Sequence, residues 1–228
     1  MSPKKDKSIV EDEAVANLST GWRKSKMSES VVQDLENMGL LQTQGVIQWR
    51  AGEGEDYPME GTLETVVFHD FVERGLALPM SEFFYALLQF WGIQLHHLTP
   101  QSILHLSIFT HFCEAFLGIL LHFHLFQHFF TLIPIPNAAK PAVIGGCEFV
   151  LHLETRDEYL AYNPAGKGNE WKSFWFHVGN FESPLPERVA GAPRSKQTGR
   201  VQDLVANKSN VFLAPLPDSK TKELLVIM

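Results

Sequence analysis

Residues 83–130 read FFYALLQFWGIQLHHLTPQSILHLSIFTHFCEAFLGILLHFHLFQHFF, and this aromatic block decides the fold. The block contains seven of the ten histidines and only one formally charged residue, Glu114. Such a long run of apolar and aromatic side chains must be buried in a core, against a partner or in lipid. Which of these environments the block occupies also determines the class of function.

Local capping signals divide the aromatic block into helices. Ser81 is the expected N-cap of a first helix, which ends at Gly92. Thr99 followed by Pro100 is typical of a helix start, because the missing N–H of proline costs nothing in the first turn. The second helix begins there, and its many apolar residues indicate burial on nearly all sides. A third helix is predicted over 122–130, before two prolines that end it.

Alternating apolar and polar residues predict strands on both sides of the block. Residues 63–76 read as a strand that places His69 and Asp70 on opposite faces and then turns. Residues 145–154 and 170–178 alternate well and are expected to pair in an antiparallel sheet. These elements predict an α+β fold in which an aromatic-rich helical layer packs on a small mixed or antiparallel sheet.

Composition divides the chain into three parts. Residues 1–27 are polar and poor in large apolar groups, which predicts a disordered tail. Residues 28–182 form the expected domain, and residues 183–228 are expected to be a flexible basic and proline-rich tail.

Charge argues against strong nucleic-acid binding. The chain carries a net charge of −7 and has a pI of about 5.8, whereas a nucleic-acid binder normally presents a basic patch. Four basic residues of the C-terminal tail are the candidate nucleic-acid contacts: Arg188, Arg194, Lys196 and Arg200. A solvated, flexible linker is the favoured interpretation of the same residues.

The two cysteines and the N-terminus favour an intracellular protein, in either the nucleus or the cytoplasm. Cys113 and Cys147 form no Cys-x-x-Cys pair, and no apolar stretch of signal-peptide length opens the chain. Residues 107–135 are long enough to span a bilayer. However, Glu114, four histidines and the lack of flanking basic residues oppose that interpretation, so no membrane partner is expected.

No catalytic motif is found. A transposase-like metal site needs three acidic residues that converge on two metal ions. Six acidic residues lie near apolar segments: Asp70, Glu73, Glu82, Glu114, Glu148 and Glu154. Because any three of them could be chosen, their presence does not indicate such a site. No Asp-Thr/Ser-Gly protease motif occurs, and two distant cysteines cannot form a zinc knuckle. We therefore predict no enzyme activity and no catalytic residues.

The histidines could bind zinc or copper, although burial at the edge of a core is the simpler interpretation. His124 and His128 are four residues apart on a predicted helix, a spacing that suits one metal. His122 precedes them, and His105 and His111 lie on the neighbouring helix. We predict no cofactor and no metal, and we expect protonation of buried histidines near pH 6 to destabilise the fold.

Several motifs occur in an order that resembles a known family. They are residues 73–76 (ERGL), 83–98, 99–105 (TPQSILH), 112–118 (FCEAFLG) and 171–176 (WKSFWF). Together they resemble the "putative gypsy-type transposon" domain of plant and grass retroelements, a domain often followed by a coiled coil. The resemblance covers roughly residues 28–182.

This resemblance implies a retroelement-derived, non-enzymatic protein, Gag-like or of unknown role. Its expected partners are a second copy of the chain or other element-encoded proteins. A nucleic-acid-binding module of a mobile element is the main alternative, with residues 188–200 as its basic arm. A membrane-associated protein built on residues 107–135 is a further alternative.

Overall fold

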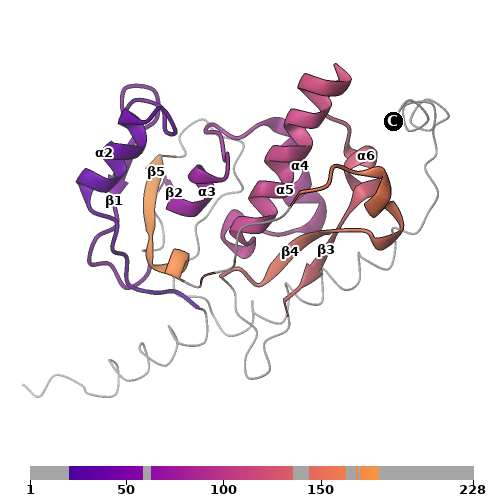
Figure 1. Cartoon of the computed structure of the whole chain (residues 1–228). Coiled ribbons are helices and arrows are strands. Elements are labelled where there is room, and N and C mark those ends of the chain that lie inside the picture. Colours follow the sequence, from indigo (N-terminus) through magenta and orange to yellow (C-terminus); the bar gives the residue numbers. More distant parts are fainter. Residues whose placement is uncertain (1–20, 59–62, 136–143, 163–167, 169, 180–228) are drawn as a thin grey trace, which may run out of the picture.

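The computed structural model describes residues 21–58, 63–135, 144–162, 168 and 170–179. Two antiparallel sheets lie on either side of central helices (Figure 1), so the predicted α+β class is confirmed. The central helices are α4 (Glu82–Trp91) and α5 (Pro100–His111). The described part also contains four short 3-10 or π-helical segments: η1 (Leu95–His97), η2 (Phe112–Leu117), η3 (Leu153–Glu158) and η4 (Glu170–Ser173).

The larger sheet joins distant parts of the sequence. Its strands are β1 (Trp49–Ala51), β2 (Glu64–Phe68) and β5 (Trp175–Gly179), in the order β1–β5–β2. β5 is antiparallel to both neighbours, with Trp175 opposite Phe68. Helix α2 (Glu29–Asn37) packs beside β1. The last described strand therefore closes the domain by inserting between the first two.

The smaller sheet corrects the predicted strand pairing. β3 (Phe130–Pro134) pairs with β4 (Cys147–Leu151), so the expected pairing of residues 145–154 with 170–178 is wrong. Both edges of β5 are occupied by β1 and β2, which leaves no edge for β4. β3 follows directly from α6 (Phe123–Phe129), and its two β-branched residues favour the extended backbone.

The predicted strand over residues 63–76 is only half correct. The chain is extended up to Phe68 and then enters the short helix α3 (His69–Glu73). Phe68, Phe71 and Val72 are buried, and their i, i+3, i+4 spacing is that of a helix face. These apolar contacts override the alternation that suggested a continuing strand.

The helix caps agree with the sequence. The Ser81 hydroxyl accepts a hydrogen bond from the Phe84 N–H (3.3 Å), and Gly92 ends α4 with a φ of 65°. The Thr99 hydroxyl accepts from the Ser102 N–H (3.3 Å) at the start of α5, where Pro100 occupies the first position. Short-range signals thus placed both helix starts correctly.

The apolar stretch 107–135 is broken into several elements. α5 continues into the π-helical η2, which ends at Gly118 with a φ of 63°. α6 begins at Phe123 and gives way to β3 at Phe130. None of the helices in the described part of the chain is long and apolar enough to cross a membrane.

The core is dominated by aromatic rings from the block. The Phe126 ring lies 5.2 Å from that of Phe109, 4.9 Å from Phe130 and 5.1 Å from Phe149. This cluster joins α5, α6 and both strands of the smaller sheet. Most apolar side chains of the block are therefore buried in this core or packed against it.

The N-terminal boundary differs from the sequence prediction. The sequence predicts a disordered tail over residues 1–27, yet Trp22, Ser25 and Met27 are buried. The Ser25 hydroxyl donates to the Trp175 carbonyl (2.6 Å), and the Trp175 indole N–H donates to the Arg23 carbonyl (2.8 Å). Trp22 and Met27, two large apolar residues in an otherwise polar stretch, pack residues 21–27 onto the core of the domain. Residues 1–20 and 180–228, which hold the rest of both predicted tails, lie outside the described residues.

Candidate interaction surface

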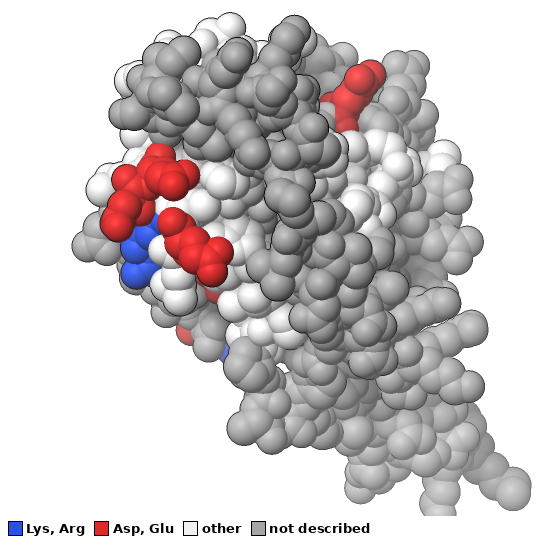
Figure 2. All heavy atoms as spheres, turned by 90° about the vertical axis from the view of Figure 1, so that its right-hand side faces the viewer, with Lys and Arg blue, Asp and Glu red and all other residues white. Residues whose placement is uncertain are grey.

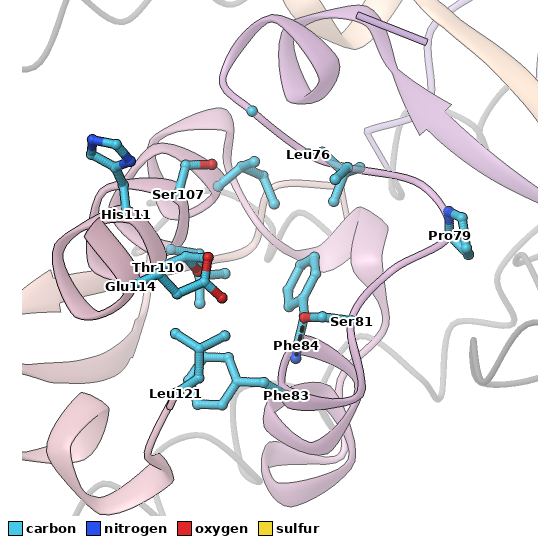
Figure 3. Close-up of a pocket in the computed structure, with 14 residues that line it drawn as sticks. Leu76, Pro79, Ser81, Phe83, Phe84, Ser107, Thr110, His111, Glu114 and Leu121 are labelled. Carbon is cyan, nitrogen blue, oxygen red and sulfur yellow. Dashed lines mark hydrogen bonds between the residues drawn. The ribbon is translucent and has the colours of Figure 1, made fainter. Parts of the chain in front are cut away.

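A pocket of about 360 Å³ opens between α4 and the α5–η2 helix (Figure 3). Its apolar wall comes from the segment before α4, from α4 itself and from the loop after η2: Leu76, Pro79, Phe83, Phe84 and Leu121. This volume lies in the range of small-molecule or side-chain sites. Figure 3 shows Phe83, Phe84 and Leu121 around the same opening.

The opposite wall carries polar groups from one face of the α5–η2 helix. Ser107, Thr110, His111 and Glu114 all line the pocket, at spacings that place them on one side of a helix. The Ser107 hydroxyl donates to the Arg74 carbonyl (2.8 Å) and therefore ties α5 to the end of α3. Glu114, the only charge of the aromatic block, lies at this opening.

Two exposed apolar residues neighbour residues that line the pocket. The side chains of Phe116 and Leu120 are 69% and 91% exposed. Phe116 packs edge-on against His111, with ring centroids 5.6 Å apart, and His111 lines the pocket. Leu120 directly precedes the lining residue Leu121. We call the pocket together with Phe116 and Leu120 the tip surface.

Sequence reasoning missed the tip surface because it treated the whole aromatic block as a buried unit. The available signal was Gly118. A glycine with a positive φ ends the helix here, and the four residues that follow reverse the chain before α6. A helix end followed by a short loop exposes apolar residues that a continuous helix would bury.

The structure does not bring the histidines considered as metal ligands together among its described residues. His105 is buried against Phe130 and Tyr162, and His128 faces Glu158. The rings of His122 and His124 lie 5.6 Å apart. Within the described ranges, the potential ligands that cluster in a group of three are His69, Asp70 and Glu73, and this group contains none of the histidines named from the sequence.

The six acidic residues weighed for transposase chemistry are dispersed over the fold. They lie on α3, α4, η2, β4 and η3, and only Asp70 and Glu73 belong to one group. The four basic residues proposed for nucleic acid, at 188, 194, 196 and 200, lie outside the described residues. Figure 2 shows one face, where described charges are few and acidic side chains gather beside a basic one.

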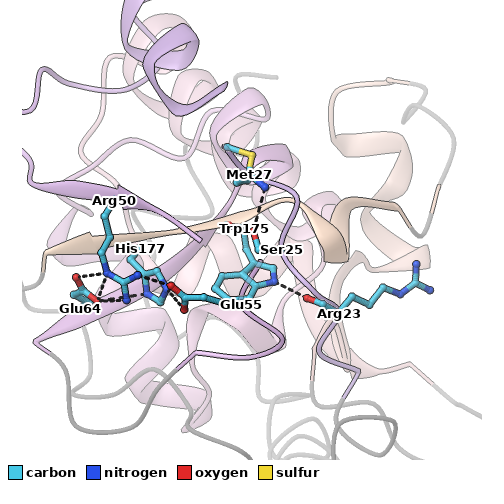
Figure 4. A network of polar contacts seen from close by, with 8 residues as sticks. All are labelled: Arg23, Ser25, Met27, Arg50, Glu55, Glu64, Trp175 and His177. Atoms are coloured by element: carbon cyan, nitrogen blue, oxygen red, sulfur yellow. Dashed lines mark hydrogen bonds and ion pairs between the residues drawn. The ribbon is translucent and has the colours of Figure 1, made fainter. Parts of the chain in front are cut away.

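A second polar feature ties the larger sheet together (Figure 4). Arg50 of β1 donates to Glu64 of β2 through Nε (2.9 Å) and Nη2 (2.8 Å), and it also bonds Glu55. His177 of β5 lies 2.9 Å from Glu55 through Nε2. Burial lowers the pKa of His177 even though this carboxylate opposes the shift. The network crosslinks three strands, so its role is structural.

Two tryptophans and both cysteines belong to the core. Trp171 and Trp175 are buried, so their rings pack in the core. Cys113 and Cys147 are buried free thiols, and burial raises the pKa of Cys113 to about 11. Neither thiol has the exposed, electropositive setting of a reactive cysteine.

The fold and the tip surface define an α+β domain with a partly apolar pocket between two of its helices. Residues 66–134 match the family model described as "Putative gypsy type transposon". The chain is thus similar to gypsy-type transposon domains over these residues, and the resemblance is confirmed there. The matched segment runs from β2 to β3 and includes every residue that lines the pocket.

Comparisons with curated proteins and with solved structures found no match.

Proposed function

We propose that this protein is a non-enzymatic, retroelement-derived protein, Gag-like in role, that acts by self-association through the tip surface. The observation that supports this proposal is the position of the exposed Phe116 and Leu120 beside an apolar pocket of the same chain. Exposed apolar groups that adjoin a pocket are typical of interaction sites.

The occupant that fits this surface is a second copy of the chain. The exposed Phe116 and Leu120 and the pocket both belong to the tip surface. A two-fold axis therefore lets each copy place these two side chains in the pocket of the other. The apolar wall of Phe83, Phe84 and Leu121 suits such side chains. Because both contacts form at once, the pairing closes on itself and buries both copies of the surface.

The energetic gain is concentrated in two residues. Burying a leucine or phenylalanine side chain stabilises by about 1.5–3 kcal/mol relative to leaving it exposed. Leu120 has nearly its whole side chain available for such burial, and Phe116 about two thirds. A dimer buries Phe116 and Leu120 of both copies. The free energy gained by this burial must exceed the entropic cost of association. We therefore expect a reversible, concentration-dependent dimer.

Sedimentation velocity of the full chain over a wide concentration range tests the proposal. The wild-type protein is expected to dimerise, and Leu120→Asp is expected to weaken dimerisation at least tenfold by placing a charge in the apolar pocket. Leu153→Asp is the matched control, because Leu153 is also strongly exposed (78%) but lies on η3, away from the pocket. It is expected to dimerise like wild type.

Two outcomes would overturn the self-association proposal. One is a wild-type monomer at every concentration, which would leave the tip surface for another element-encoded protein. The other is equal weakening by Leu153→Asp and Leu120→Asp. Absorbance at 260 and 280 nm should accompany the run, because a peak loaded with nucleic acid that strips at high salt would favour the nucleic-acid-binding alternative.

The non-enzymatic part of the proposal rests on the catalytic motifs that the sequence lacks. A DNA cleavage and strand-joining assay with Mg²⁺ and Mn²⁺ tests it, and no product is expected. Metal-dependent cleavage that is lost on changing one acidic residue would refute this part without bearing on dimerisation.

A further inference from the structure

Helix α3 presents three potential metal ligands on a rigidly held segment. Phe71 and Val72 are buried beneath the helix, and the His69 N–H donates to the Phe174 carbonyl (2.9 Å) at the entry to β5. The remaining side chains face outward: His69 and Asp70 are half-buried, and Glu73 is exposed. Ligands carried by an anchored element are positioned before any ion arrives.

The ligand atoms of these three residues are close together. One atom each from His69, Asp70 and Glu73 lies within 4.8 Å of the other two, and His69 Nδ1 is 3.5 Å from Glu73 Oε2. Ligands of one zinc-sized ion, each at about 2.0–2.2 Å from the metal, lie roughly 3–3.5 Å apart. Small side-chain rotations therefore suffice to bring all three atoms onto one cation.

Electrostatics at this cluster also favours a cation. The Asp70 and Glu73 carboxylates belong to one close group, in which Asp70 is half-buried and Glu73 exposed. The two carboxylates thus repel each other in a partly desolvated position. A divalent ion between them would replace this repulsion by attraction.

We propose that His69, Asp70 and Glu73 form a binding site for a first-row divalent cation, with Zn²⁺ as the best-fitting ion. One imidazole nitrogen and two carboxylate oxygens suit zinc and its neighbours, whereas Mg²⁺ and Ca²⁺ favour all-oxygen sites. Three protein ligands leave at least one coordination position open to solvent or to a partner. This site lies outside the tip surface, so it stands independently of the proposed self-association.

Calorimetric titration of Zn²⁺ into the chelator-treated full chain tests this site. Wild type is expected to bind one ion through the cluster, and His69→Gln and Glu73→Gln are each expected to weaken that binding at least tenfold. His128→Gln is the matched control: His128 also faces a carboxylate, Glu158 at 3.4 Å, but belongs to no three-ligand group. Its Zn²⁺ affinity should equal that of wild type.

Co²⁺ absorption provides a second readout in the same variants. Bound Co²⁺ should show visible bands of mixed nitrogen and oxygen ligation that His69→Gln abolishes and His128→Gln preserves. Asp70→Asn serves as a third ligand variant if either of the first two fails to fold by circular dichroism. The proposal is overturned if wild type binds no Zn²⁺, if the ligand variants bind as wild type does, or if the control weakens equally.

Discussion

Acid should destabilise this fold through a pair of buried histidines, His96 and His97. Their rings pack edge to face, 4.3 Å apart, in the η1 segment that precedes α5. His97 Nδ1 accepts a hydrogen bond from the Gln94 N–H (3.1 Å), which requires that nitrogen to be unprotonated. Burial lowers the pKa of His97 to about 4. Burial and the neighbouring His97 lower the pKa of His96 well below its ordinary value.

The sign and size of the effect follow from proton linkage. Below the ordinary pKa of 6.5 the unfolded chain takes up protons that the folded chain excludes, so stability is full above pH 7 and falls as the pH decreases. For His97 a shift from 6.5 to about 4 corresponds to about 3.4 kcal/mol in total, of which about 2 kcal/mol is lost by pH 5. His96 adds a loss in the same direction.

Urea unfolding at pH 7.5 and pH 5.0 measures this loss. Wild type should lose at least about 2 kcal/mol more between the two pH values than His97→Asn, whose amide oxygen can replace Nδ1 as acceptor but cannot be protonated. His124→Asn is the control, because His124 is exposed, and it should follow wild type. Equal losses for wild type and His97→Asn would refute the reasoning, since they would show that His97 is not buried as a neutral group.

Two further predictions concern local geometry. Thr99→Ala removes the N-cap of α5 and leaves the Ser102 N–H without its side-chain acceptor, so thermal unfolding should show a loss of about 1 kcal/mol; an unchanged Tm would contradict the cap. Gly75 has a φ of 90°, and an added Cβ would lie 2.6 Å from Ser107 Oγ, so Gly75→Ala should cost more than Gly39→Ala. Gly39 has a φ of 72° and open space around it. Equal losses on urea unfolding would show that the contact with Ser107 carries no cost.

Sequence determined the features of this protein that depend on near neighbours. Ser81, Thr99 and Pro100 mark helix starts through interactions that span three residues, and Gly92 marks a helix end through its own backbone freedom. The family resemblance also rests on short motifs, and the match to residues 66–134 confirms it over that segment.

Only the tertiary structure decided which strands pair, what is exposed and which ligands meet. Alternation identified β5 as a strand but could not show that it inserts between β1 and β2, because strand partners are chosen by long-range packing. A strand over residues 63–76 would place His69 and Asp70 on opposite faces. Burial of Phe71 and Val72 instead folds residues 69–73 into α3, which brings His69 and Asp70 together with Glu73. The exposure of Leu120 likewise depends on the chain reversal after Gly118, because composition records that a side chain is apolar but not what covers it.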